Sequence, residues 1–173
     1  MSLGRVLLGE REIRDRVRKL GEEISRDYSG NELLLVGVLK GAFIFLADLV
    51  RYLTIPVRLD FITAASYGES LRSSEKVIIL KDLRIDLKDR HVLIVEDIVD
   101  TGLTIDLLLG SLAGRSPASI KTCTLLDKPG RRMVDVKVDY VGFAIPDEYV
   151  VGYGLDYQDN YRCLKDIFVL GRC

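Results

Sequence analysis

The chain has 173 residues, with 25 lysine and arginine residues against 26 aspartate and glutamate residues, and 48% of its residues are hydrophobic. This balance indicates one soluble globular domain and excludes a global basic field for nucleic acid, although it leaves room for a local basic patch. No apolar run of about 20 residues could span a bilayer, no signal-peptide pattern is present, and three cysteines fit no disulfide or metal-binding spacing. We therefore expect a cytoplasmic protein with free thiols.

Strand and helix patterns alternate along the first part of the chain. Residues 10–27 place apolar side chains at helical spacing among charges, which predicts an amphipathic helix. The continuous apolar run of residues 33–39 predicts a strand buried on both faces, and residues 40–53 predict a helix packed on it. Further strands are predicted over residues 57–66, 76–83 and 91–97.

The later part of the chain continues this alternation. A helix is predicted over residues 104–115, and strands are predicted over residues 119–126, 139–145 and 166–171. The pattern favours an α/β fold with an open parallel sheet and helices on both faces. Ligands of such sheets bind beyond the carboxyl ends of the strands, which directs attention to the segments after residues 39, 66, 97 and 126.

The stretch VLIVEDIVDTGLT, residues 92–104, joins a predicted buried strand, ending at Val95 or Glu96, to three carboxylates and a turn that opens a helix. Glycine lets the backbone approach a ligand, and free N–H groups at a helix start favour a phosphate. The carboxylates of Glu96, Asp97 and Asp100 are costly unless a cation or hydroxyl groups meet them. A ribose 5-phosphate group would satisfy both features. A helix N-cap by Asp100 or Thr101, or a solvated acidic loop, would explain the same residues without a ligand.

This stretch resembles the phosphoribosyl-diphosphate (PRPP) binding signature of type I phosphoribosyltransferases. The order of VGVLKGAFIFLADLVR, SYG, LLDKP, IPDEYVVGYGLDY and YRCL is similar to the hypoxanthine-guanine branch over roughly residues 8–170. The resemblance implies a Rossmann-like open parallel sheet flanked by helices, with a small hood built from N- and C-terminal segments. We expect a single domain over residues 1–173, with its core at about 30–145 and its hood at about 1–15 and 146–173.

The resemblance also implies a reaction, which is purine salvage. The 5-phosphoribosyl group of PRPP would pass to N9 of hypoxanthine, giving IMP, or of guanine, giving GMP, with release of pyrophosphate. Mg²⁺ is the implied cofactor, the chain would form a homodimer or homotetramer, and neither nucleic acid nor membrane is an implied partner. The alternatives are a xanthine-preferring or uracil enzyme, an RNA-binding pyrimidine-operon regulator of the same fold, and a phosphoribosyl sensor without catalysis.

The resemblance assigns the ribose and phosphate to the opening stretch. Glu96 and Asp97 would hold the ribose hydroxyls and share a magnesium. The 5-phosphate would lie on the turn formed by Asp100, Thr101, Gly102, Leu103 and Thr104. Asp100 would also act as general base near purine N7. Many relatives carry a polar or basic residue in place of Leu103, so phosphate binding would rely on backbone and hydroxyl donors.

Two further segments are assigned to pyrophosphate. The turn of Leu39, Lys40 and Gly41 would bind it together with Arg162, and in the family the first peptide of this turn is often cis, which is rare outside X-Pro bonds. A plain surface lysine is the alternative for Lys40. The stretch SYGESLRSSE, residues 66–75, resembles the mobile lid of the family, in which Ser66 and Tyr67 would close over the diphosphate.

The purine would be bound by two segments near the end of the chain. Lys128 would donate to O6 of a 6-oxopurine, because an ammonium group has donors and no acceptor, and Asp127 could orient it. Tyr149 would stack on the purine face, and backbone groups near Val150 and Asp156 would bind the purine edge. Asp156 would also ligate a second magnesium. A Lys-Pro turn without a ligand and a half-buried strand tyrosine are the alternatives.

Overall fold

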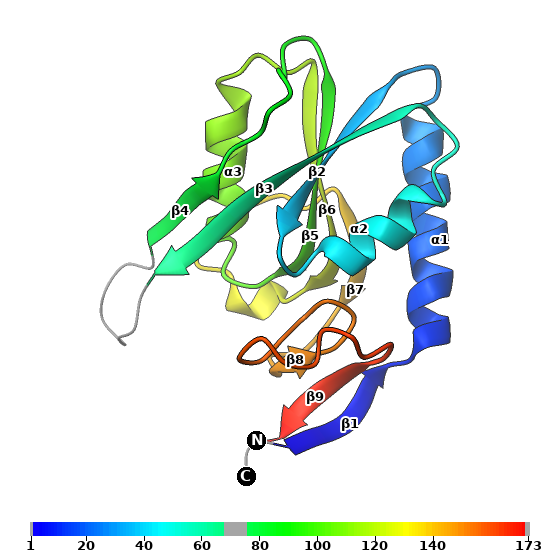
Figure 1. Cartoon of the computed structure of the whole chain (residues 1–173), viewed down its shortest axis with the longest axis vertical. Helices are drawn as coiled ribbons and strands as arrows, with labels where there is room; N and C mark the ends of the chain where they lie inside the picture. The colour runs from blue at the N-terminus through cyan, green and yellow to red at the C-terminus, as the bar shows by residue number, and fades with distance from the viewer. Residues whose placement is uncertain (1, 68–75, 172–173) are drawn as a thin grey trace.

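A computed structural model describes residues 2–67 and 76–171 as an α/β structure (Figure 1). The main sheet has the strand order β4-β3-β2-β5-β6-β7. Its strands are β2 (Leu33–Leu39), β3 (Val57–Tyr67), β4 (Lys76–Lys81), β5 (His91–Val99), β6 (Ser119–Asp127) and β7 (Tyr140–Ala144). All neighbours are parallel except β4, which is antiparallel to β3. The segment between β3 and β4 is too short for a parallel crossover, so this edge departs from the predicted all-parallel sheet.

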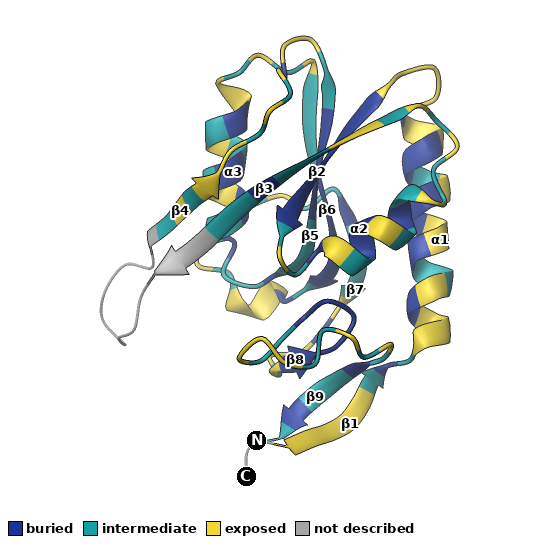
Figure 2. Ribbon diagram, viewed as in Figure 1, coloured by how far each residue is buried: buried dark blue, intermediate teal, exposed yellow. Residues whose placement is uncertain are grey.

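Helices cover both faces of this sheet, as predicted. Helices α1 (Glu10–Asp27) and α2 (Phe43–Val50) lie on one face, and α3 (Leu103–Ala113) lies on the other (Figure 1). Leu33 and Leu35 of β2 belong to the core cluster of α1 and α2, whereas Leu34 and Val36 belong to the cluster of α3. Successive strand residues point to opposite faces, so a strand covered on both sides is apolar throughout. Figure 2 shows the corresponding buried stripes on the helices.

Two boundaries differ from the sequence expectations. Helix α2 is shorter than predicted, because residues 40–42 form a turn before it and residues 51–52 form another after it. Strand β5 runs on to Val99, because Glu96, Ile98 and Val99 still pair with β6. The expectation that the strand ends at Val95 or Glu96 is therefore wrong, and Glu96 and Asp97 lie within β5, near its carboxyl end.

A second sheet lies beyond the end of the main sheet at which β2, β5 and β6 finish (Figure 1). Its strands are β1 (Ser2–Leu8), β9 (Ile167–Gly171) and β8 (Val150–Val151), in the antiparallel order β1-β9-β8. Strand β1 was not expected from its sequence, because most of its residues are exposed and carry little apolar pattern. None of the helices in the described ranges is both long and apolar enough to cross a membrane.

Candidate functional site

The turn between β5 and α3 leaves backbone N–H groups available at the start of the helix. Gly102, with φ +87°, is the N-cap residue, so the alternative that Asp100 or Thr101 holds this position is wrong. Thr101 Oγ1 accepts only a long bond of 3.5 Å from the Leu103 N–H. A Cβ at Gly102 would lie 2.9 Å from Val136 Cγ2 in a conformation that L side chains rarely adopt. A pocket of about 230 Å³ is lined by residues 98–105 together with Glu96 and Arg131. Its size and open donors suit a phosphate group.

Two buried carboxylates border this turn. Glu96 Oε2 is buried and has no hydrogen-bond partner among the described residues. Burial, and next the neighbouring Asp97 carboxylate, raises the pKa of Glu96 well above its usual range. Burial raises the pKa of Asp97 to about 6, although the Ile98 N–H, which donates to Asp97 Oδ1 at 3.0 Å, opposes the rise. The Ile98 N–H and the Arg162 charge thus offset only part of the burial cost at Asp97, and further hydroxyl donors or a cation would make both charges more favourable.

The same acids offer oxygen ligands that suit Mg²⁺. The described ranges hold no group of three or more His, Cys, Asp or Glu side chains that could by itself bind a metal ion. However, Mg²⁺ commonly takes one or two carboxylates and completes its shell with water and substrate phosphates. The orphaned oxygen of Glu96 and the nearby carboxylates of Asp97 and Asp156, whose charge raises the Asp97 pKa, match that donor set.

The turn after β2 packs directly on Asp97. The peptide between Leu39 and Lys40 is cis, as the family resemblance implied. Gly41 lies so close to the strand that a Cβ at this position would be 1.7 Å from Asp97 Oδ2. Only glycine fits here, so the backbone of the predicted pyrophosphate turn contacts Asp97, one of the two acids predicted to bind the ribose, without an intervening side chain.

Two predicted cations meet above this turn. Lys40 Nζ lies 3.2 Å from Asp159 Oδ1, and one guanidinium nitrogen of Arg162 lies 3.3 Å from the same oxygen and 2.7 Å from Asp156 Oδ1. Lys40, and next Arg162, holds the pKa of Asp159 below its usual range. Asp159 was not singled out from the sequence, although it stands three residues after Asp156, and it keeps both cations together at this end of the site.

Asp100 lies between two other cations. Lys128 Nζ is 3.7 Å from Asp100 Oδ2, and Arg131 Nε is 3.1 Å from Asp100 Oδ1. Both cations also approach Asp147, at 3.9 and 3.6 Å. Lys128 is only 6% exposed, whereas the side chains of Asp100 and Asp147 are 37% and 59% exposed, so the pocket opens to solvent on the side of the two acids.

This ammonium group and Asp100 line a pocket of about 250 Å³, which also receives Tyr149 and Val150. Tyr149 is 55% exposed and meets the Tyr157 ring edge-on, with 5.8 Å between the ring centroids. Its ring is therefore available for stacking. The pocket also includes Asp97 and Asp156, so it reaches the acids that are predicted to bind the ribose and magnesium. Ser66 and Tyr67 end β3, and the rest of the predicted lid lies outside the described residues.

Arg132 is a functional residue that the sequence reasoning missed. Its guanidinium donates to the carbonyl oxygens of Val99 at 2.9 Å and Asp100 at 2.6 Å, and it pairs with the Asp127 carboxylate. Asp127 therefore does not orient Lys128, contrary to expectation, because its carboxylate forms an ion pair with Arg132 instead. The signal in the sequence was the arginine pair directly after Lys-Pro-Gly. Arg132 fixes the backbone on both sides of the Asp100 carboxylate.

Comparisons with known proteins agree with this geometry. A family model described as "Phosphoribosyl transferase domain" matches residues 7–158. The hypoxanthine phosphoribosyltransferase of Salmonella typhimurium is 51% identical over 161 residues, which cover 92% of this chain and 90% of that protein. The hypoxanthine-guanine phosphoribosyltransferase of Bacillus subtilis is 47% identical over 169 residues, covering 98% and 94%. A crystal structure of the hypoxanthine-guanine enzyme from Bacillus anthracis superposes with a TM-score of 0.94 at 42% identity, covering 98% of this chain and all of that one.

Proposed function

Because this chain belongs to the phosphoribosyl transferase family, among its hypoxanthine and hypoxanthine-guanine enzymes, we propose that it is a purine-salvage enzyme. It transfers the 5-phosphoribosyl group of PRPP to N9 of hypoxanthine or guanine and releases pyrophosphate. One observation carries the proposal: Asp100 lines both the phosphate-sized pocket at the turn and the neighbouring pocket that contains Lys128 and Tyr149. A sugar phosphate and a planar base can therefore bind on the two sides of one acid.

The sugar phosphate binds to the open N–H groups of the turn and to the buried acids beside it. The backbone N–H groups and threonine hydroxyls of the turn donate to the 5-phosphate, so Leu103 adds no side-chain contact. The ribose hydroxyls donate to Asp97 and to Glu96, whose Oε2 has no other donor among the described residues. Binding thus relieves the cost of holding two buried acids side by side.

The base binds between Tyr149 and the carboxyl end of β5. The Lys128 ammonium leaves Asp100 to donate to O6, while Arg131 continues to hold the other oxygen of the Asp100 carboxylate. As N9 attacks C1 of the ribose, Asp100 accepts the proton from the purine. A 6-amino group would place donors against the Lys128 donors, so adenine is rejected.

The leaving pyrophosphate requires positive charge in a water-poor site. Lys40 and Arg162 provide it, because both are held at the same end of the site by Asp159. Mg²⁺, held by Glu96, Asp97 and Asp156, would supply further neutralisation of the diphosphate oxygens. Closure of the lid that begins at Ser66 and Tyr67 would exclude water, which would otherwise hydrolyse PRPP.

One assay tests this function. Purified protein is incubated with PRPP and Mg²⁺ and with each of hypoxanthine, guanine, xanthine, adenine and uracil, and the nucleotide product is measured. We expect IMP and GMP, with no product from adenine or uracil. Preference for xanthine would favour the xanthine enzyme, and no product from any base would favour a binding protein. The RNA-binding regulator is not favoured by the relatives found.

The assembly is proposed on the family resemblance. The chain would act as a single domain with its hood, as a homodimer or homotetramer. Sedimentation at assay concentration measures this state, and a monomer with full activity would remove the proposal.

A further inference from the structure

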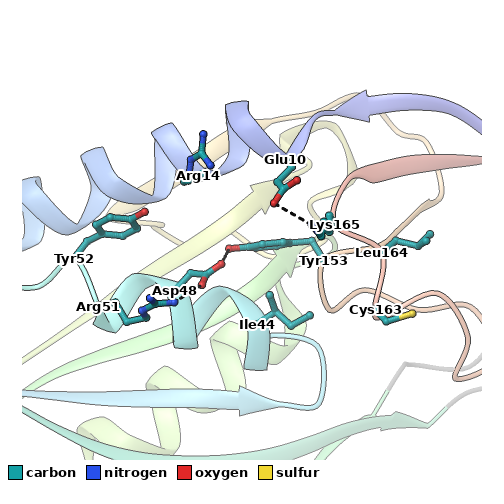
Figure 3. A pocket seen from close by; sticks show the side chains of 10 residues that line it. All are labelled: Glu10, Arg14, Ile44, Asp48, Arg51, Tyr52, Tyr153, Cys163, Leu164 and Lys165. Atoms are coloured by element: carbon teal, nitrogen blue, oxygen red, sulfur yellow. Dashed lines mark hydrogen bonds and ion pairs between the residues drawn. The ribbon is translucent and has the colours of Figure 1, made fainter.

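A pocket of about 470 Å³ lies apart from the two substrate pockets, between α1, α2 and the loop before β9 (Figure 3). The hydroxyl of Tyr153 donates a hydrogen bond of 2.7 Å to Asp48 Oδ2 on α2 within this pocket. Tyr153 is 7% exposed, and burial, followed by the bond to Asp48, raises its pKa above the usual range. The hydroxyl therefore stays a donor at working pH, and the bond links α2 to the loop.

The loop around Tyr153 has an uncommon backbone conformation. Tyr153 has φ +52°, between Gly152 at +105° and Gly154 at +100°. Its backbone is held by the Tyr153 N–H donating to Leu164 O at 2.8 Å and the Gly154 N–H donating to Arg162 O at 3.0 Å. A bulky residue in this region is unfavourable and persists only where its surroundings hold it. The Asp48 bond is one of the contacts that hold it.

The same loop contacts both parts of the predicted pyrophosphate site. A Cβ at Gly154 would lie 2.3 Å from Gly41 O, so the two backbones are in direct contact. The Gly154 carbonyl accepts a 2.7 Å bond from Arg162. Because α2 begins two residues after Gly41, the Asp48–Tyr153 bond closes a ring that joins the turn, the helix, the loop and Arg162.

We propose that Asp48 and Tyr153 are positioning residues for the pyrophosphate end of PRPP. Their hydrogen bond holds the residue 152–154 loop against Gly41 and thereby sets where Arg162 lies. Neither side chain touches substrate. The inference rests on the proposed function and extends it to residues outside the substrate pockets. Lys128 follows β6 and lies outside this ring, so its contact to O6 does not depend on the bond. Leu155 and Asp156, which directly follow the loop, also line the purine pocket, so a smaller effect on purine binding is expected.

The test variant is Tyr153→Phe, which removes the hydroxyl and keeps the ring. Asp48 is not stranded by this change, because its side chain is 41% exposed and lies 3.9 Å from Arg51. We expect the KM for PRPP, and the KM for pyrophosphate in the reverse reaction, to rise about tenfold, as loss of one bond to a charged acceptor can produce. The KM for hypoxanthine should rise by a clearly smaller factor, because Lys128 and Tyr149, which make the main purine contacts, lie outside the ring.

Four further variants separate positioning from general stability. Tyr140→Phe is a matched control, because Tyr140 also donates to an acid, Asp27 Oδ2, at 2.8 Å, but at the far end of the sheet. It should lower the Tm and leave the KM for PRPP unchanged. Asp48→Asn keeps an acceptor and should resemble wild type, whereas Asp48→Ala should resemble Tyr153→Phe. The double variant Tyr153→Phe/Asp48→Ala should be no worse than either single variant.

The outcomes distinguish this inference from the proposed function. Wild-type protein that makes no nucleotide from PRPP would count against the function itself. With active wild type, the positioning role is overturned by an unchanged KM for PRPP in Tyr153→Phe. It is equally overturned if the KM for hypoxanthine rises in step, or if Tyr140→Phe raises the KM for PRPP as much.

Discussion

Replacing Asp97 by asparagine should stabilise the ligand-free protein while weakening PRPP binding. Burial raises the pKa of Asp97 from 3.8 to about 6, a rise of roughly two units. At about 1.4 kcal/mol per unit, the ionised carboxylate costs about 2–3 kcal/mol of folding free energy at pH 8. Asparagine carries no charge, and its carbonyl oxygen can still accept the bond that the Ile98 N–H donates to Asp97 Oδ1. The gain at pH 8 should therefore approach that cost.

The pH dependence gives the sign of this effect. Because the folded-state pKa lies above the unfolded one, native protein binds a proton between about pH 4 and 6 that unfolded protein has released. Wild-type stability should therefore fall as pH rises through this window, and the full cost is present above pH 6. Urea unfolding of wild type and Asp97→Asn at pH 4.5 and pH 8 measures it. The difference between the two proteins should be large at pH 8 and small at pH 4.5.

A matched aspartate of opposite behaviour provides the control. Burial of Asp60 opposes ionisation, but backbone N–H donors from Ile85, Phe61 and Arg84 outweigh it and hold the pKa of Asp60 below its usual value. Asp60→Asn should therefore lower stability at pH 8. If Asp97→Asn were equally or less stable than wild type at pH 8, the reasoning about the buried acid would be refuted.

Three other substitutions test separate parts of the site. Asp100→Asn should lower kcat by about 100-fold while PRPP binding, measured by calorimetry, survives; near-normal turnover would remove Asp100 as the base. Lys128→Ala should weaken discrimination between hypoxanthine and adenine in competition assays, and an unchanged preference would contradict the contact to O6. Gly41→Ala places a methyl group 1.7 Å from Asp97 Oδ2, so it should abolish measurable PRPP binding while the protein stays folded by circular dichroism; retained affinity would mean that the turn moves freely.

Local patterns in the sequence were sufficient to locate the strands of the main sheet and the three helices, and they predicted the phosphate turn. The apolar run of β2 indicated burial on both faces, and two packed faces were found. The Thr-Gly-Leu-Thr turn after a buried strand indicated a phosphate-binding helix start, because the open N–H groups there follow from local backbone geometry. The family resemblance then supplied the purine and pyrophosphate residues, which lie far apart in the chain.

Only the tertiary structure decided which charges meet. Asp127 and Lys128 are adjacent in sequence, yet Asp127 pairs with Arg132 and Lys128 turns to Asp100, because neighbouring residues of a strand end point in different directions. Strand β1 exists through its pairing with β9 from the other end of the chain, and its own sequence carries little signal. The bond between Asp48 and Tyr153 likewise joins residues more than 100 positions apart, and no local pattern encodes such a contact. The sequence determined which groups the site could use, and the packing of distant segments determined how they are held.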